Sequence, residues 1–202
     1  MSRYTGPKSR LCRREGICLC GREKCAVKKK SYIPGMHGQK GSLGKPSEYA
    51  RQLREKQKLK RLYGITERQL GNYFAEAAKK KEITGNALLK LLEARLDNVV
   101  YRSGIAKTRA QARQMVSHGL IKVNQRKVDV PSFQTKVGDK FEIIERLKKS
   151  SLFAELEKQK FAPAKWLKVD YKGLNCEVAR SLEADDLEKA IQMSLVVEYY
   201  SK

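Results

Sequence analysis

The sequence predicts an α+β fold, and three observations lead to that prediction. Four of the five cysteines lie within a strongly basic N-terminal segment, amphipathic helical patterns follow it, and the central stretch changes from helical periodicity to short alternating strands. We therefore expect a zinc-bound basic N-terminal arm at residues 1–45. A helical domain should occupy residues 46–92 and be completed by the C-terminal tail, at about residues 180–202. Residues 93–179 should form a module with two helices packed on a small antiparallel sheet, followed by a β extension.

The charge of the chain narrows the classes of partner. The 202 residues include 44 Lys or Arg against 22 Asp or Glu, a formal net charge of +22. A protein this basic needs an anionic partner, and nucleic acid is the first candidate, before an acidic membrane surface. No apolar run approaches the ~20 residues of a membrane span, and the N-terminal residues lack an apolar signal core, which argues against secretion. We expect no membrane partner.

The cysteine spacing predicts a metal site in the arm. Cys12, Cys18, Cys20 and Cys25 have the spacing C-x5-C-x-C-x4-C, which fits metal binding in a reducing compartment better than disulfides. Four thiolates so close together suit one tetrahedral, structural Zn²⁺ ion. The alternatives are three of these cysteines with His37 as the fourth ligand, or reduced free thiols. An ion here would hold the arm together and would carry no chemistry.

The central stretch predicts two short helices and then strands. Apolar residues recur at helical spacing up to Val100, Gly104 is placed to end that helix, and Thr108 can cap a second helix that Gly119 ends. Expected strands follow at 121–124, 128–130 and 141–144. The hairpin between the first two would turn at Asn124-Gln125. Because a two-residue type I′ turn needs positive φ at both positions, Gln there would cost about 1 kcal/mol, and we expect a wider turn.

Further elements follow from capping signals and periodicity. Ser47 should cap a helix that Gly64 ends, Thr66 and Gln69 have the spacing of a capping box, and a third helix should start at Thr84. A helix is expected around residues 145–160 and a hairpin at 166–178. The apolar tail at 195–200 should dock back onto the body of the protein.

Cationic side chains on these elements are the candidate nucleic-acid contacts. In the helix from Ser47 only Glu55 interrupts the positive charge, and in the central module Arg recurs at i and i+4, which suits phosphate binding. The alternative is an ordinary solvated basic face, or a linker for residues 32–40. The candidate residues are Arg3, Lys8, Arg10, Arg13, Arg14, Lys28, Lys29, Lys30, His37, Lys40, Arg51, Arg54, Lys56, Lys58, Arg61, Arg109, Arg113, His118, Lys122, Asn124, Arg126 and Lys127.

Four central motifs resemble the S4 RNA-binding domain. They are RLDNVVYR at 95–102, TRAQARQ at 108–114, HGLIKVN at 118–124 and VGDK at 137–140. The resemblance extends over the whole chain, to the bacterial-type S4 family of small-subunit ribosomal proteins. It is carried by MSRYTGPK at 1–8, LCRREG at 11–16, PGMHG at 34–38, RQLREKQK at 51–58 and the final EYYSK. Zinc-bearing relatives have a C-x2-C pair near the start, but here Ser9 stands at its first position, and Cys18 is the obvious substitute.

The resemblance implies a structural constituent of the small ribosomal subunit. Such a protein is a primary binder of 16S rRNA that nucleates 30S assembly at a multi-helix junction of the 5′ domain. It would neighbour other small-subunit proteins, including the fifth, would line the path by which mRNA enters, and would contribute to translational accuracy. We expect a single copy, with no homo-oligomer, in a cytoplasmic ribosome, while an organellar ribosome stays open.

Two rival classes share single features with the chain. An RNA-modifying enzyme can carry the same central module, but it would need a catalytic domain, and this chain has only two His. A zinc-dependent DNA-binding regulator would need a helix that reads base edges. The uniformly basic helix from Ser47 fits phosphate contact better. We therefore expect no enzyme.

Overall fold

The computed structural model describes residues 4–22, 24–40, 45–145 and 163–201. The chain divides into two compact units, Met1–Leu88 with Glu188–Lys202, and Leu89–Leu187. In the described part of the chain, no helix has the length and apolar character needed to cross a membrane. The helix expected around residues 145–160 falls almost wholly on residues 146–162, outside the described ones.

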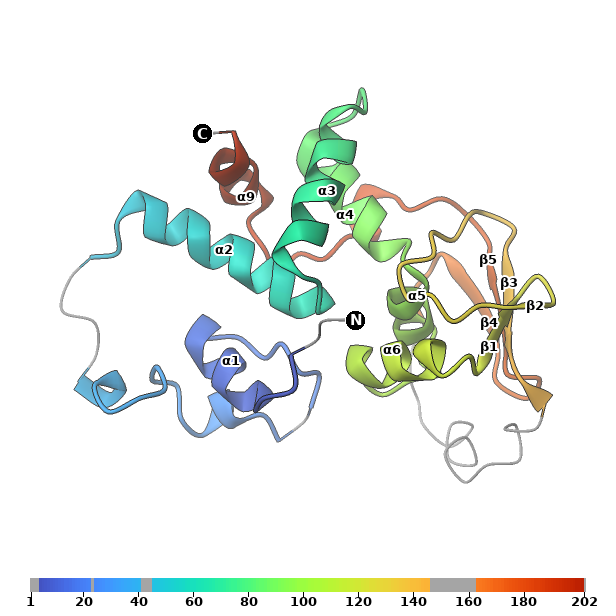
Figure 1. Cartoon of the computed structure of the whole chain (residues 1–202), viewed down its shortest axis with the longest axis horizontal. Helices are drawn as coiled ribbons and strands as arrows, with labels where there is room; N and C mark the ends of the chain where they lie inside the picture. Colours follow the sequence, from blue (N-terminus) through green and yellow to red (C-terminus); the bar gives the residue numbers. More distant parts are fainter. Residues whose placement is uncertain (1–3, 23, 41–44, 146–162, 202) are drawn as a thin grey trace. The chain divides into compact units, whose positions relative to one another are not determined.

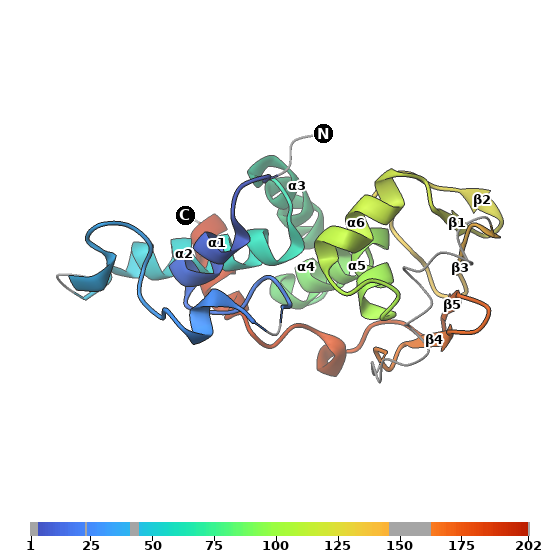
Figure 2. The same cartoon turned by 90° about the horizontal axis from the view of Figure 1, so that it is seen from below.

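The first unit is helical (Figures 1 and 2). Its elements are α1 (Lys8–Glu15), the short 3₁₀ helices η1 (Ala26–Lys28) and η2 (Gly38–Lys40), α2 (Glu48–Tyr63), α3 (Glu67–Ala78), α9 (Met193–Tyr200) and the start of α4 (Thr84–Glu93). The expected caps are confirmed. Ser47 accepts a hydrogen bond from the Ala50 amide at 3.2 Å, and Thr66 and Gln69 form a reciprocal capping box.

The C-terminal helix α9 packs against α2. The Gln52 side-chain amide donates to Glu198 at 3.1 Å, and the Tyr200 hydroxyl donates to Glu67 at 3.1 Å. Val196 is fully buried in this contact region. The expected docking of the apolar tail onto the body is confirmed within this unit.

The arm contains a helix that the sequence pattern does not predict. In α1 the inward positions are Cys12 and Glu15, both buried, and Gly16 ends the helix with φ +70°. A hydrophobic pattern cannot reveal such a helix, because one inward side chain is a thiol and the other is a carboxylate held by tertiary ion pairs.

The second unit packs two helices on an antiparallel sheet, as expected. Helices α5 (Leu96–Arg102) and α6 (Arg109–Ser117) precede β1 (Ile121–Val123), β2 (Arg126–Lys127), β3 (Lys140–Ile143), β4 (Leu167–Asp170), β5 (Asn175–Val178) and η3 (Ala184–Asp186). The five strands have the order β2-β1-β3-β5-β4. One core joins both helices to the sheet, and it includes Val99, Met115, Ile121, Phe141 and Trp166.

The expectation of a wider hairpin turn is wrong. Asn124 and Gln125 have φ of +47° and +67°, and Val123 pairs with Arg126, so the turn has two residues and the return strand is Arg126–Lys127. The Asn124 side chain explains why the tight turn is stable. Its amide donates to Asp139 at 2.8 Å and its oxygen accepts from the Lys140 amide at 3.0 Å. These bonds to the start of β3 offset the cost of positive φ at Gln125.

We predict that Gly119→Ala lowers the stability of this unit by about 2 kcal/mol. Gly119 has φ +64°, and a Cβ there would lie 2.1 Å from Cε of Lys127. In a Lys127→Ala background the contact is gone, and the loss should fall to about 1 kcal/mol. Urea unfolding followed by Trp166 fluorescence measures both, because the single Trp is buried in this core.

Gly138→Ala is the matched control. Gly138 also has positive φ, +89°, but a Cβ there would meet nothing within 4 Å. Its loss should be about 1 kcal/mol in both backgrounds. Equal losses for Gly119→Ala in the two backgrounds would show that the Lys127 side chain does not cross Gly119.

Candidate metal centre and nucleic-acid interface

Three cysteines of the arm converge on one point. Cys12 comes from α1, Cys20 from the loop after it, and Cys25 from the residue before η1. Their sulfur atoms all lie within 4.8 Å of one another. Cys18 adjoins this group, with its Sγ 3.7 Å from Sγ of Cys20. Among the described residues, His37 is exposed and does not belong to the group. The three grouped cysteines could hold a metal ion.

Burial disfavours the charged thiolate form of two of these cysteines. Burial raises the pKa of Cys12, and it raises the pKa of Cys25 to about 12. Burial also acts to raise the pKa of Cys20, but hydrogen bonds from the Arg22 amide and the neighbouring thiols outweigh it, so that pKa is lowered. Without a cation, a cluster of buried thiolates would be strongly unfavourable. A bound metal cation supplies the missing positive charge and favours the thiolate form.

Distance supports a tetrahedral ion. With Zn–S bonds of about 2.3 Å, the sulfurs of a tetrahedral site lie about 3.8 Å apart. The separation of 3.7 Å between Cys18 and Cys20 matches one edge of such a site. Thiolate sulfur is a ligand that zinc prefers in structural sites. The three grouped cysteines therefore fit zinc as donors.

Glu15 attaches the arm to α2. Its buried carboxylate accepts hydrogen bonds from Arg54 at 3.2 Å and from Arg61. Burial raises the pKa of Glu15, although both arginines act in the opposite direction. Arg54 and Arg61, both candidate nucleic-acid contacts, are thus also structural ion-pair partners of Glu15.

Two further cations of α2 are held internally. Lys56 is buried, with its ammonium 2.6 Å from Glu67 and 4.3 Å from the ring centre of Tyr199. Lys58 donates to Glu55 at 2.5 Å. Arg51 is exposed. RNA contact by the cations of α2 stays a prediction, and the structure favours Arg51 as the most accessible of them.

The arm cations also differ in accessibility. Arg13 stacks on the Tyr32 ring at 4.5 Å and donates to the Tyr32 carbonyl at 3.1 Å, so it has a structural task. Lys8 is half-buried. Arg3 and the Lys40 side chain fall outside the described part of the structure. The exposed candidates are Arg10, Arg14, Lys28, Lys29, Lys30 and His37.

A buried polar network lies beneath α5 and α6, and the sequence did not reveal it. The Arg95 guanidinium donates to both oxygens of Asp97, at 3.1 and 2.9 Å, and Arg113 approaches Asp97 at 3.6 Å. Asp97 and Arg95 are nearly fully buried. The motif at 95–102 could have indicated this network, because it places charged and amide residues inside an otherwise apolar helix.

A second part of the network is centred on Glu93. This fully buried carboxylate accepts from Asn98 at 2.5 Å and from Arg102 at 2.6 and 2.9 Å. The oxygen of Asn98 in turn accepts from Arg109 at 2.9 Å, and Arg109 stacks on Tyr101 at 4.5 Å. The network therefore orients Arg109 and Arg113, the two arginines that the sequence assigned to phosphate binding.

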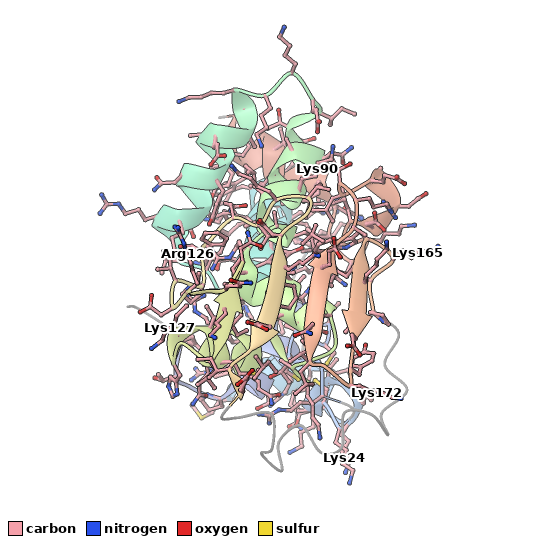
Figure 3. All side chains as sticks on the ribbon, turned by 90° about the vertical axis from the view of Figure 1, so that its right-hand side faces the viewer. Lys24, Lys90, Arg126, Lys127, Lys165 and Lys172 are labelled. Atoms are coloured by element: carbon pink, nitrogen blue, oxygen red, sulfur yellow. The ribbon has the colours of Figure 1, made fainter. Side chains whose placement is uncertain are left out.

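The β1–β2 hairpin gathers cations at one edge of the sheet. Lys122 and Lys127 are directly opposite each other on neighbouring strands, and Arg126 and His118 are exposed nearby in sequence. Figure 3 shows Arg126 and Lys127 at this edge and Lys165 and Lys172 at the opposite one. Within the described ranges, no carboxylate forms an ion pair with the hairpin cations. The side chain of Asn124 is instead engaged in holding the turn.

Two helices on an antiparallel sheet, with cations along one hairpin, are features of an RNA-binding protein. The ribosomal protein S4/S9 N-terminal domain matches residues 3–93, and the S4 domain matches residues 94–141. The chain is 47% identical to small ribosomal subunit protein uS4 of Thermus thermophilus, 46% to that of Thermodesulfovibrio yellowstonii and 49% to that of Caldicellulosiruptor bescii, over the full length of both chains in each case. The chain belongs to the uS4 family of small ribosomal subunit proteins.

We predict that Glu93→Ala destabilises the second unit by about 3 kcal/mol, because it leaves Arg102 and Asn98 without a buried carboxylate partner. Urea unfolding followed by Trp166 fluorescence measures this loss. The matched control is Glu177→Ala, which removes a solvent-exposed pair with Lys140 at 3.9 Å and should cost less than about 1 kcal/mol. Similar losses in both variants would mean that the Glu93 network does not support the fold.

Proposed function

We propose that the protein is a primary 16S rRNA-binding protein that nucleates 30S assembly at a multi-helix junction of the 5′ domain. Membership in the uS4 family and the matched S4 domain support this function. A role in translational accuracy follows from the family resemblance. The protein acts as a structural brace and turns over no substrate.

The cationic hairpin is the observation that carries the proposal. Like charges directly opposite each other on neighbouring strands are unfavourable, yet Lys122 and Lys127 occupy such a pair. Glu142, which lies opposite Lys122 on β3, offsets only part of this repulsion. An RNA phosphate beside them would convert that repulsion into attraction. Arg109 and Arg113 lie on α6, which leads directly into this hairpin. The central module thus offers a continuous set of cations along the chain from α6 to β2.

The recognition mode is contact with phosphates and shape. Double-helical RNA presents mainly phosphates and 2′-hydroxyls to a protein, so sequence reading is secondary. Each of the two units supplies its own exposed cations, Arg10, Arg14 and Lys28 among them in the first. Counterion release makes the affinity for RNA strongly dependent on salt.

In the same proposal, the arm holds one structural Zn²⁺ ion through Cys12, Cys20, Cys25 and Cys18. The convergence of the first three sulfurs and the short distance from Cys18 to Cys20 support this ligand set over one with His37. The zinc would supply fold stability to a segment with few apolar residues. The domain scheme is an arm at 1–45, a helical domain at 46–92 with 180–202, and the S4 domain with its β extension at 93–179.

The partners and location follow from the same family. Besides 16S rRNA, the protein would contact neighbouring small-subunit proteins, including the fifth, and mRNA on its way into the ribosome. It would act as one copy per particle in a cytoplasmic ribosome. The names of the relatives, each a small ribosomal subunit protein, support a place in the small ribosomal subunit.

We predict about one zinc per chain by metal analysis of the purified protein. Cys18→Ser should lower zinc retention against a chelator, because it removes the fourth sulfur, whereas His37→Ala should leave it unchanged. Cys176→Ala is the control, since this buried cysteine belongs to β5 of the second unit. Loss of zinc in His37→Ala together with retention in Cys18→Ser would reverse the assignment of the fourth ligand.

We predict that Lys122→Gln combined with Arg126→Gln lowers the affinity for a transcript of the 16S 5′ domain by about tenfold to a hundredfold. The opposite edge of the sheet offers a control with the same loss of charge, Lys165→Gln combined with Lys172→Gln, which should weaken binding much less. Filter binding at several salt concentrations measures both. If the two double variants bind equally well, the hairpin is not the contact surface of the second unit.

A further inference from the structure

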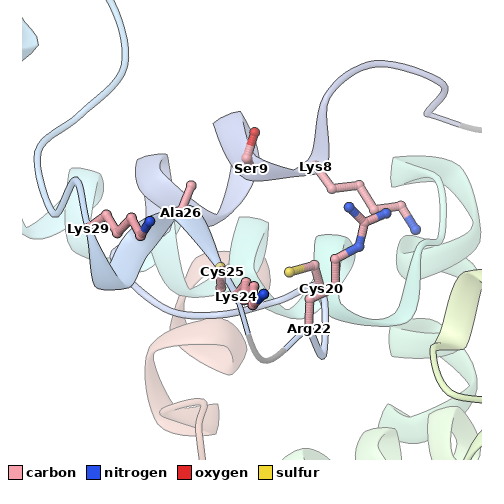
Figure 4. A pocket seen from close by; sticks show the side chains of 8 residues that line it. All are labelled: Lys8, Ser9, Cys20, Arg22, Lys24, Cys25, Ala26 and Lys29. Carbon is pink, nitrogen blue, oxygen red and sulfur yellow. The ribbon is translucent and has the colours of Figure 1, made fainter.

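A cavity opens directly over the cysteine cluster. Its volume is about 280 Å³, and it is lined by Lys8, Ser9, Cys20, Arg22, Lys24, Cys25, Ala26 and Lys29. This space is large enough to hold a phosphate group. Figure 4 shows that these side chains come from α1, from the cysteine loop between α1 and η1, and from η1 and the residue after it.

Four of the eight lining residues carry positive charge. Figure 4 shows the Arg22 side chain rising from the cysteine loop to the end of Lys8. Burial lowers the pKa of Lys8, and the neighbouring charge of Arg22 lowers it further. Among the residues that the structure describes, no carboxylate forms an ion pair with Lys8, Arg22, Lys24 or Lys29. Glu23 lies outside the described residues.

The cavity therefore gathers positive charge around an open space. Neighbouring cations repel one another, and a bound anion relieves that repulsion. Arginine and lysine side chains are also the usual donors to phosphate oxygens, and Lys8 and Arg22 are the two that approach each other here. The nearest carboxylate in α1, Glu15, is engaged with Arg54 and Arg61 of α2.

We propose that this cavity binds one backbone phosphate of the RNA, with Lys8 and Arg22 as its principal donors and Lys24 and Lys29 at its rim. The assignment rests on the proposed RNA-binding function and adds Arg22 and Lys24 to the contacts expected from the sequence. Because Cys20 and Cys25 line the cavity and also belong to the thiol cluster, the metal site and the phosphate site share one loop.

Because the two sites share a loop, a bound metal ion would also affect the phosphate site. An ion that fixes Cys20 and Cys25 also fixes the backbone from which Arg22 and Lys24 extend. Two anionic groups then face the same cations, the thiolates on one side and the phosphate on the other. The cations lie between the two and lessen the repulsion between them.

The test compares two double variants of the full-length, zinc-loaded protein. Lys8→Gln with Arg22→Gln removes the principal donors, and Lys80→Gln with Lys81→Gln removes the same charge from exposed lysines after α3. Affinity for the 16S 5′-domain transcript is measured by filter binding from low to moderate salt. The cavity variant should lower the slope of log K against log salt by roughly 0.7–0.9, the value expected for the loss of one phosphate contact. The control should change the slope little.

A second measurement distinguishes binding of an RNA phosphate from binding of free phosphate. Amide resonances of residues 20–29 are followed by NMR while inorganic phosphate is added to the RNA-free protein. A slope that drops in the cavity variant supports the RNA assignment, and weak, saturable shifts with inorganic phosphate agree with it. A slope equal to that of the control overturns the assignment, even if inorganic phosphate binds tightly.

Two measurements show whether a loss of binding could come from misfolding of the variant. Zinc content and circular dichroism show whether the cavity variant still folds. If the cavity variant does not fold, the variant Lys24→Gln with Lys29→Gln, which removes only rim cations, takes its place. The rim variant should lower the slope in the same direction. If the wild-type protein itself fails to bind the transcript, the proposed function fails. If the wild type binds and both cavity variants keep its slope, only the phosphate site fails.

Discussion

Buried carboxylates must be paired, and this constraint organises both units of the protein. In a chain of net charge +22, the described part nonetheless buries the acidic residues Glu15, Glu55, Glu93 and Asp97. Each of them holds cations from the chain around it. Removing water from a carboxylate is so unfavourable that an unpaired one would not persist inside the fold. The ion pairs therefore fix where the surrounding arginines and lysines can lie.

This constraint divides the cations into two groups. Arg54 and Arg61 contact the buried Glu15, and the buried Lys56 contacts the exposed Glu67. Lys122, Arg126 and Lys127 form no ion pair with a carboxylate among the described residues. Arg109 and Arg113 are intermediate, because the network at Asp97 and Asn98 orients them. A guanidinium has five N–H donors, so an arginine that bonds a buried partner can still donate to a phosphate. For these two arginines, internal pairing and RNA contact are compatible.

Local sequence signals were sufficient wherever the structure depends on neighbouring residues. The caps at Ser47, Thr66 and Thr108 lie within three residues of the amides they bind, and the two-helix module on its sheet followed from periodicity. The tight turn at Asn124-Gln125 was missed because its stability comes from Asp139 and Lys140, about fifteen residues later. Helix α1 was missed for the same kind of reason, since Glu15 is stabilised by arginines some forty residues away.

The arm shows most clearly how few apolar contacts a segment needs when other interactions hold it. Its buried side chains are Cys12, Cys25 and Glu15, so hydrophobic burial contributes little to its order. The thiol cluster holds the loop to α1, and the Glu15 ion pairs hold α1 to α2. Both are electrostatic, and both leave the outer surface free to carry Lys and Arg. An apolar core would have required inward hydrophobic residues from a segment that devotes so many positions to cations. Thiol and carboxylate anchors thus allow a short, highly charged segment to fold and still keep most of its charged side chains exposed.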